Sequence, residues 1–203
     1  MFLVKSPAII KKYYPKLVWE IPNNENKIYL TFDDGPIPEV TDWVLDLLKQ
    51  YNIKATFFCI GDNVVKHPAV FQRIITEDHA VGNHTFNHLN GWKTSSETYL
   101  ANIEACKEIV STTIFRPPYG RIKKTQVQDL TKEYKIIMWD VLSGDFDAKT
   151  SPEKCYNNVV ENAKEGSIIV FHDSVKASKN LKYALPKVIE YLLEKGFVFD
   201  VLE

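Results

Sequence analysis

Short apolar runs rich in β-branched and aromatic residues alternate along this chain with segments whose apolar residues recur at helical spacing. Seven of the runs predict strands, over residues 27–32, 54–60, 79–84, 113–118, 134–139, 167–172 and 197–202. The six segments between them predict helices, over residues 39–51, 67–78, 95–111, 123–133, 151–166 and 180–196. In the first helix, one apolar stripe at spacings of three and four is formed by Val40, Val44, Leu47 and Leu48. This alternation is typical of a parallel sheet whose strands are joined by right-handed helical crossovers.

Capping residues support several of these boundaries. Ser151 precedes a proline at the start of one predicted helix, and Gly166 and Gly196 end two others. Pro186 falls inside the last predicted helix, so we expect that helix to begin late or to kink there.

Chemically distinctive residues gather at the carboxyl ends of the predicted strands. These ends carry Asp33 and Asp34, Gly61 and Asp62, His84, Arg116, residues 140–145, and His172. Seven strands and six helices fit either a closed barrel or an open, doubly wound sheet. In a barrel all the carboxyl ends converge on one mouth, whereas in an open sheet they spread along an edge. A site assembled from five strands therefore favours an α/β barrel with its active site at that mouth.

The length and charge of the chain limit its possible functions. The 203 residues suit one domain with a sizeable core, and no repeat or linker divides them. Lys and Arg number 25 and Asp and Glu 26, for a formal net charge of -1, so no global field would attract nucleic acid or an anionic membrane. Cys59, Cys106 and Cys155 are far apart and odd in number, which argues against a disulfide framework or a cysteine-based zinc site.

Residues 1–26 precede the first predicted strand, and we expect them to pack on the barrel as a tail. Their apolar stretches are broken by charges and a proline, and no small-residue cleavage site follows, which is unlike a signal peptide. No apolar run approaches the length of a membrane span. The default expectations are a monomer and a cytoplasmic location, with association with the cell envelope left open.

Two adjacent carboxylates, Asp33 and Asp34, end the first predicted strand in the stretch TFDDGP. Two like charges at the end of a buried strand are costly unless something compensates them. An isolated Asp-Gly-Pro is most often a turn or a helix cap.

His84 and His88, in GNHTFNH, are four residues apart, a spacing that lets two imidazoles share one metal ion. Two surface histidines are the alternative, but a carboxylate would complete a His₂-carboxylate set with an open position, and the cation would neutralise one of the two charges.

The stretch FRPPYG holds Arg116 in a fixed direction, because a residue before proline stays extended. The two prolines have no N–H, so Tyr119 offers the first free backbone donor on a rigid turn. An arginine can anchor a carboxylate, and a preorganised N–H can meet an oxyanion. A rigid connection with a surface arginine is the alternative.

The apolar strand SIIVFH ends on His172, which is either a satisfied core histidine or a proton donor tuned by a carboxylate. Asp145, in WDVLSGDFD, and the adjacent Asp173 are both candidates for that partner.

The stretches TFDDGP, HTFNH, RPPYG, WDVLSGDFD and IVFH resemble, in this order, the five motifs of the polysaccharide deacetylases. This is the NodB-homology family, also called carbohydrate esterase family four. The resemblance spans about residues 27–200, and the first three motifs match closely. It implies a distorted (β/α)7 barrel of the TIM type and a divalent metal. It also implies the removal of N- or O-acetyl groups from sugar polymers such as chitin, peptidoglycan and xylan.

The resemblance also implies a role for each motif residue. Asp33 resembles the general base, with Arg116 holding it. The metal ligands would be Asp34, His84 and His88. His172 resembles the general acid, with Asp145 orienting it.

Four further residues are expected on the substrate side of the site. The Tyr119 N–H would complete the oxyanion hole, and Trp139 opens the fourth motif. Val170 stands where the family usually has a leucine lining the acetyl-methyl pocket, and Phe146 where it usually has a tryptophan. Both departures are apolar, so the pocket is retained while the preference for acyl group and sugar is open.

These inferences predict a metal-dependent deacetylase acting on N-acetylglucosamine-type glycans. Zn²⁺ is the expected ion, and Co²⁺ and Ni²⁺ also suit histidine and carboxylate ligands. One alternative is hydrolysis of a C–N bond in a non-carbohydrate amide or imide. Another is a glycan-binding module with a dead site, which the intact motif residues argue against.

Overall fold

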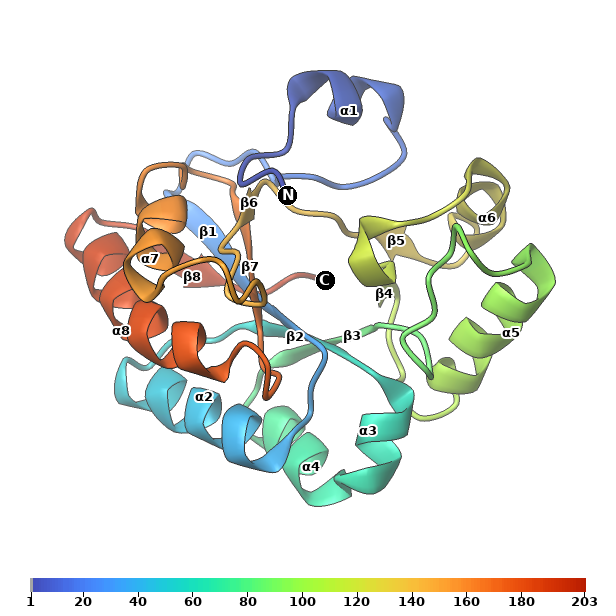
Figure 1. The fold of residues 1–203 in the computed structure, drawn as a ribbon, viewed down its shortest axis with the longest axis horizontal. Coiled ribbons are helices and arrows are strands. Elements are labelled where there is room, and N and C mark those ends of the chain that lie inside the picture. The colour runs from blue at the N-terminus through green and yellow to red at the C-terminus, as the bar shows by residue number, and fades with distance from the viewer. Residues whose placement is uncertain (1) are drawn as a thin grey trace.

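The parallel strands of the computed structural model, which describes residues 2–203, curl into an incomplete barrel with helices around its outside (Figure 1). Eight strands occur in this part of the chain: β1 (Lys27–Asp33), β2 (Thr56–Cys59), β3 (Ala80–Asn83), β4 (Ile114–Phe115), β5 (Lys135–Ile136), β6 (Val141–Leu142), β7 (Ile168–His172) and β8 (Val198–Asp200). Their order across the sheet is β5-β4-β3-β2-β1-β7-β6, and β8 pairs with the first half of β1. The strand pairs run parallel, which places their carboxyl ends at one mouth.

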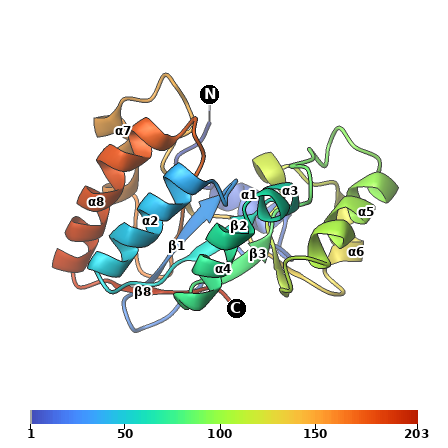
Figure 2. The ribbon, with the colours of Figure 1, turned by 90° about the horizontal axis from the view of Figure 1, so that it is seen from below.

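Apart from α1, which precedes β1, the helices lie in the connections between these strands. Their bounds are α1 (Ala8–Tyr13), α2 (Pro38–Gln50), α3 (Gly61–Lys66), α4 (Pro68–Thr76), α5 (Ser96–Lys107), the 3₁₀ turn η1 (Pro118–Gly120), α6 (Lys124–Leu130), α7 (Pro152–Val160) and α8 (Ser178–Glu194). Figure 2 shows α8, α2 and α4 in a row along one stretch of the sheet, with α5 and α6 beyond β3. Over residues 2–203, no helix combines the length and apolar character needed to cross a membrane.

The alternation of side chains along β1 explains how the sheet is buried on both faces. Leu30 and Phe32 pack in one core cluster with residues of α2 and α8, whereas Tyr29 packs in another with residues of β2 and β7. Because successive side chains of a strand point to opposite faces, Thr31 and Asp33 share the inner face with Tyr29. β1 therefore delivers a carboxylate to the inside of the barrel, at its mouth.

The architecture confirms the predicted α/β fold, a distorted (β/α)7 barrel with the candidate site at the carboxyl ends of its strands, but several elements differ from the prediction. The run 113–118 contains only the two-residue β4, because the prolines that follow cannot continue a ladder. The run 134–139 contains β5, and the barrel gains β6, which was not predicted. The predicted strand 197–202 is β8, which pairs beside the start of β1 instead of completing the barrel.

Several helices also depart from the prediction. α7 ends at Val160 and not at the predicted Gly166, and α5 ends at Lys107, before the predicted residue 111. α1 and α3 were not predicted, and α3 fills the interval between the predicted strand 54–60 and the predicted helix 67–78. α8 runs through Pro186 and begins at Ser178, earlier than expected. The burial of its apolar face, which includes Leu181, Leu185 and Val188, stabilises the helix by more than the loss of one backbone hydrogen bond at the proline destabilises it.

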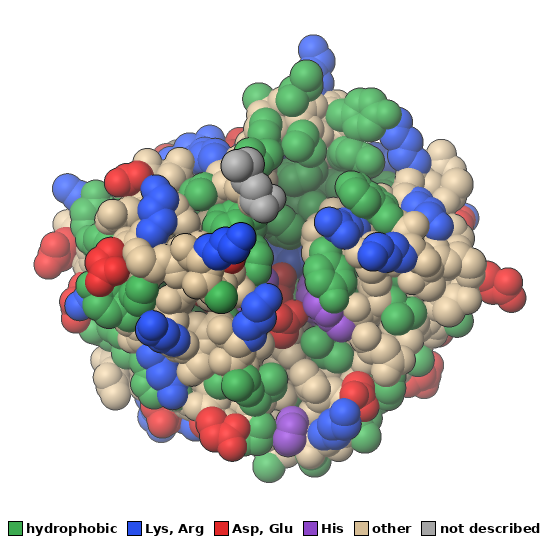
Figure 3. Space-filling view, viewed as in Figure 1, with side chains coloured by type: hydrophobic (Ala, Val, Ile, Leu, Met, Phe, Trp, Pro, Cys, Tyr) green, Lys and Arg blue, Asp and Glu red, His purple; other side chains and the backbone are tan. Residues whose placement is uncertain are grey.

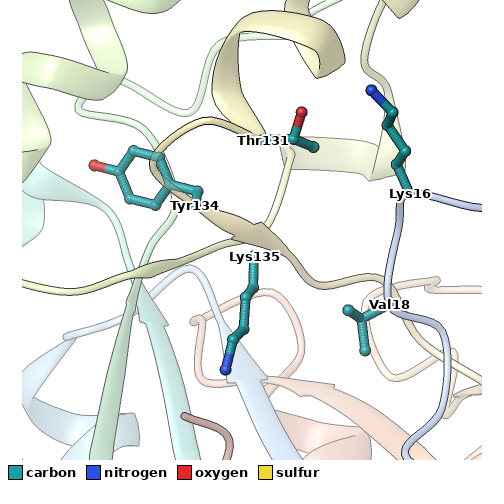
Figure 4. A pocket seen from close by; sticks show the side chains of 5 residues that line it. All are labelled: Lys16, Val18, Thr131, Tyr134 and Lys135. Atoms are coloured by element: carbon teal, nitrogen blue, oxygen red, sulfur yellow. The ribbon is translucent and has the colours of Figure 1, made fainter.

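The N-terminal segment, residues 2–26, crosses the gap between β5 and β6. Val18 forms a parallel bridge with Ile137, and Lys5 an antiparallel bridge with Val141. The Met138 N–H donates to the Val18 carbonyl at 2.7 Å, which fixes the crossing. A shallow pocket lies where the segment passes β5, lined by two lysines, Lys16 and Lys135, together with Val18, Thr131 and Tyr134 (Figure 4). None of these five residues belongs to the predicted site. Of the predicted tail, residue 1 lies outside the described residues.

Candidate active site

The predicted site residues meet at the mouth of the barrel. Asp33 ends β1, and the strand register places it beside His172 at the end of β7. His84 directly follows β3, and Arg116 directly follows β4. In Figure 3, acidic and histidine side chains lie together at the bottom of a hollow near the centre of the face viewed.

Arg116 and Asp33 form a buried ion pair on the inside of the barrel. The Arg116 side chain is fully buried, and its Nη1 donates to Asp33 Oδ1 at 2.7 Å and to Thr31 Oγ1 at 2.8 Å. Its Nη2 donates to the Met138 carbonyl at 3.0 Å, and the guanidinium lies 4.0 Å from the centre of the Phe58 ring. A buried charge is tolerated only when it is paired and hydrogen-bonded, as this one is. The guanidinium thus supplies the counter-charge for the first of the two adjacent carboxylates.

Asp34 faces the two histidines instead. Its Oδ1 lies 3.1 Å from His88 Nε2 and 3.8 Å from His84 Nε2, and the three ligand atoms all lie within 4.8 Å of one another. A tetrahedral ion with bonds of about 2.0–2.1 Å separates its ligand atoms by roughly 3.3 Å, so this donor set fits a divalent cation. The His84 Nδ1 lies 2.8 Å from the Arg116 carbonyl, a contact that directs Nε2 toward Asp34.

The protonation states of these groups also suit a metal site. Burial lowers the pKa of His84 to about 4, so its imidazole is neutral and can ligate. Burial alone would raise the pKa of Asp34, but the hydrogen bond from His88 and the nearby imidazoles hold it well below its usual range. A neutral imidazole and an ionised carboxylate are the forms in which these side chains bind metals.

His172 and Asp145 form a second acid–base pair at the mouth. The Asp145 carboxylate accepts two hydrogen bonds from the same residue, from the His172 backbone N–H at 2.7 Å and from its Nδ1 at 2.8 Å. Burial alone would lower the pKa of His172, but the charge and hydrogen bond of Asp145, together with the charges of Asp34 and Asp33, raise it to about 9. His172 is therefore protonated at neutral pH. Of the two carboxylates that the sequence left open as its partner, the structure places Asp145 there.

Several site residues adopt backbone conformations that non-glycine residues rarely occupy. Among residues 2–203, seven non-glycine residues have positive φ, and four of them lie at the site: Asp34, Thr85, His88 and Tyr119. Such strain persists only where the surrounding structure holds it, and it clusters at functional sites. Tyr119 is 60% exposed, and its ring centre lies 4.6 Å from that of His88. The RPPYG turn therefore covers one side of the candidate metal site.

The other three residues expected on the substrate side occupy different depths. Phe146 is half-buried, with its ring centre 5.0 Å from that of His172. Val170 is fully buried on β7, two residues before His172 and on the same face. Trp139 is half-buried and packs against Gly120, where an added Cβ would lie 2.6 Å from its ring. Phe146 thus reaches the mouth beside His172, and Val170 lies beneath it.

The Asp33-Asp34 turn is held by Asp173, which the sequence offered only as a candidate partner of His172, and by Asn63, which had no assigned role. The buried Asp173 carboxylate accepts from the Gly35 N–H at 2.9 Å and from Thr41 Oγ1 at 2.6 Å. Asn63, in α3, donates to the Asp34 carbonyl at 2.7 Å. Neither contact has a local sequence signal, because each joins residues far apart in the chain. The position of Asp173 directly after His172 was the one available indication.

Comparisons with known proteins agree with this geometry. The family model described as polysaccharide deacetylase matches residues 20–136. A peptidoglycan-N-acetylglucosamine deacetylase of Bacillus cereus is 38% identical over 191 residues, covering 90% of this chain and 89% of that protein. This chain belongs to the polysaccharide deacetylase family. A chitooligosaccharide deacetylase of Azorhizobium caulinodans is 34% identical, covering 90% of this chain and 95% of that protein.

The fold comparison extends the likeness of this deacetylase over nearly its whole length. The crystal structure of the Bc1960 peptidoglycan N-acetylglucosamine deacetylase, in complex with 4-naphthalen-1-yl-N-oxidanyl-benzamide, superposes with a TM-score of 0.89. Its sequence identity is 35%, covering 97% of this chain and 95% of that one. The protein is a glycan deacetylase, a hydrolase that acts on carbon–nitrogen bonds other than peptide bonds. Deacetylases of this family are metal-dependent, in accord with the Asp-His-His set.

Proposed function

We propose that this deacetylase hydrolyses the N-acetyl groups of N-acetylglucosamine residues in peptidoglycan or chitin-like oligomers. The names of its similar relatives support this substrate class, since they include deacetylases of peptidoglycan N-acetylglucosamine and of chitooligosaccharides. The observation that carries the mechanism is the placement of two groups at the ends of adjacent strands: Asp33, ion-paired with Arg116, and His172, hydrogen-bonded to Asp145. Hydrolysis of an amide needs both a base for water and an acid for the leaving nitrogen.

Asp33 acts as the general base in this proposal. Its carboxylate is nearly buried, and the fully buried Arg116 holds one oxygen at 2.7 Å. The other oxygen remains for the proton of the attacking water. Because Thr31 and two backbone carbonyls also anchor the guanidinium, the base has a fixed direction.

His172 acts as the general acid. Its Nδ1–H is held by Asp145, so the opposite nitrogen, Nε2, carries the proton that passes to the leaving amine. The raised pKa keeps that proton in place at neutral pH until the carbon–nitrogen bond breaks. The nitrogen of the sugar leaves as an amine, and the acyl group leaves as acetate.

Two groups would stabilise the negative charge that develops on the acyl oxygen. The Tyr119 N–H is preorganised by the rigid turn that the two prolines form, and it fits the role of an oxyanion donor. Asp34, His84 and His88 would hold the divalent cation, for which we propose Zn²⁺. When bound, such a cation polarises an acyl oxygen and lowers the pKa of a water molecule.

Acetate release tests this function. The protein loaded with Zn²⁺ is incubated with N-acetylglucosamine oligomers, with peptidoglycan and with a non-sugar amide, and free acetate is measured. We expect release from the glycans, its loss with a chelator, and its return when Zn²⁺, Co²⁺ or Ni²⁺ is added. Release only from the non-sugar amide would refute the glycan substrate and favour a general amide hydrolase.

Matched variants separate the proposed roles. Asp33→Asn and His172→Ala should each lose most turnover while metal content stays at the wild-type level. His84→Ala should lose the metal, whereas His67→Ala should keep both metal and activity, since His67 lies at the junction of α3 and α4, outside the site. A His84→Ala protein that retains its metal would show that the ligand assignment is wrong.

A further inference from the structure

The N-terminal segment is fastened along the stretch that carries Asp145. The Ser6 N–H donates to the Asp140 carbonyl at 3.0 Å, and the Leu142 N–H donates to the Val4 carbonyl at 2.8 Å. Two lysines of the segment, Lys5 and Lys11, reach the fully buried Asp140 carboxylate at 3.1 and 2.6 Å. Charge pairs with a buried carboxylate are costly to break, so residues 4–6 are held firmly beside β6.

This attachment brings the start of the chain to the mouth of the barrel. Phe2 lies on Gly144, where an added Cβ would come within 2.3 Å of the Phe2 ring. Gly144 also has φ of +79°, a conformation that L side chains rarely adopt. Both the space and the backbone at this position therefore require glycine, and the close approach of Phe2 fills the space.

A chain of aromatic contacts leads from Phe2 to the proposed acid. The ring centres of Phe2 and Phe146 are 5.2 Å apart with planes at 56°, and those of Phe146 and His172 are 5.0 Å apart with planes at 66°. Both phenylalanines are half-buried. Phe146 is therefore held between the N-terminal segment on one side and the acid on the other. Tilted and edge-on contacts of this kind favour particular ring orientations.

We propose that Phe2 is a positioning residue of the active site, which acts through Phe146. It holds the Phe146 ring against His172 and thereby shapes the apolar wall that the acetylated sugar meets beside the acid. The N-terminal segment is in this way a part of the substrate site, although it lies outside the segment that the family model matches. The inference rests on the proposed function, because the wall matters only if an acylated glycan binds there.

A double-mutant cycle in steady-state kinetics tests the coupling. Phe2→Ala should lower kcat/KM for an N-acetylglucosamine oligomer by about 3- to 10-fold, mostly through a higher KM, as expected for the loss of one aromatic contact. Phe146→Ala should have at least as large an effect. In the Phe146→Ala background, Phe2→Ala should have almost no further effect, because the residue through which it acts is gone. The Phe2→Tyr protein, which keeps the aromatic ring, should have the wild-type kcat/KM.

Leu3→Ala is the matched control, since Leu3 belongs to the same segment and its side chain is 58% exposed. It should leave kcat and KM unchanged. A purely structural role for Phe2 predicts a lower melting temperature with unchanged KM, and that result would overturn the proposal. Equal losses from Phe2→Ala in the wild-type and Phe146→Ala backgrounds would overturn it as well.

A second readout does not depend on turnover. The proton resonances of the His172 imidazole sense the Phe146 ring current, so Phe2→Ala should shift them and Leu3→Ala should not. Wild-type protein that releases no acetate would refute the proposed function while this measurement still tests the contact. Active wild-type protein with an unmoved His172 signal in Phe2→Ala would refute the positioning role alone.

Discussion

Replacing Asp145 by Asn tests how the proposed acid is kept protonated. The Asp145 carboxylate, 1% exposed, accepts from both the backbone N–H and the Nδ1 of His172. The two hydrogen bonds reach different oxygens of the carboxylate, and an asparagine replaces one of those oxygens with an NH₂ group, so it cannot accept both in place. Either the backbone N–H of His172 loses its partner, or the imidazole accepts from the amide and becomes neutral. Both outcomes remove the negative charge beside the ring.

The expected size of the effect follows from the pKa of His172. Burial alone would lower it, and the charge and hydrogen bond of Asp145 are the main causes that raise it to about 9. Without them the pKa should fall to the ordinary value of about 6.5 or below. At pH 7.5 the protonated fraction would then drop from about 97% to about 10%, which predicts at least a roughly tenfold loss of kcat at that pH.

The assay is an NMR titration of the imidazole protons, with a His172→Ala protein to assign the signal, combined with kcat measured from pH 6 to 10. The folded-state pKa of His172 is raised above its unfolded value, so its contribution to stability is fully present below about pH 6.5 and is lost as the pH rises through about 9. The pH-dependent part of the stability difference between wild type and variant should therefore vanish above that pH. An unchanged titration midpoint in Asp145→Asn would refute the reasoning.

Three further predictions concern the groups around the two adjacent carboxylates. Arg116→Met leaves Asp33 buried without its counter-charge and should lower the free energy of unfolding in urea by about 3–5 kcal/mol. Adding Asp33→Asn should recover part of that loss, so strictly additive effects of the two substitutions would contradict the prediction. His84→Ala should weaken Zn²⁺ binding, measured by calorimetry, by more than about 100-fold, since even the replacement of a residue that only orients a metal ligand lowers metal affinity by about 10–100-fold. An equal loss of affinity in His67→Ala would contradict the assignment of His84 as a ligand. Asp173→Ala removes two buried hydrogen bonds and should lower the free energy of unfolding by about 2–4 kcal/mol. It should also lower the affinity for Zn²⁺ by about 10-fold, and Asp173→Asn should be closer to wild type in both stability and affinity.

The elements that the sequence predicts most accurately are those whose pattern is set by burial. β1, β7 and α2 lie within two residues of their predicted bounds, because their apolar residues face other elements along their whole length. The run 134–139 is different. Ile137 and Met138 are as buried as strand residues, yet beyond the Ile137 N–H, which donates to the Phe115 carbonyl of β4, the backbone there pairs with Val18 of the N-terminal segment. An apolar run reports burial, and it cannot report which backbone will be the partner.

The residues of the candidate site also differ in how far the sequence alone could predict them. Residues in compact motifs, such as His84 and His88, could be predicted because the chemistry needs them at a fixed spacing. The roles of Asp173 and Phe2 could not, since each depends on a contact with residues about 140 positions away in the chain, at Gly35 and Phe146. Such contacts exist only once the barrel has formed. The structure is therefore needed to see what holds the motif residues in place.

The adjacent carboxylates show how local backbone geometry divides two like charges between two partners. If β1 simply continued, side-chain alternation would send Asp34 to the face of Phe32, among the helices. The positive φ of +85° at Asp34 breaks the alternation, so both carboxylates reach the mouth, one at Arg116 and the other at the histidines. This conformation is strained for a residue with a Cβ. Asn63 donates to the Asp34 carbonyl and Asp173 accepts from the next N–H, and these two contacts hold the turn in the conformation that puts the proposed base, Asp33, beside the proposed metal ligand, Asp34.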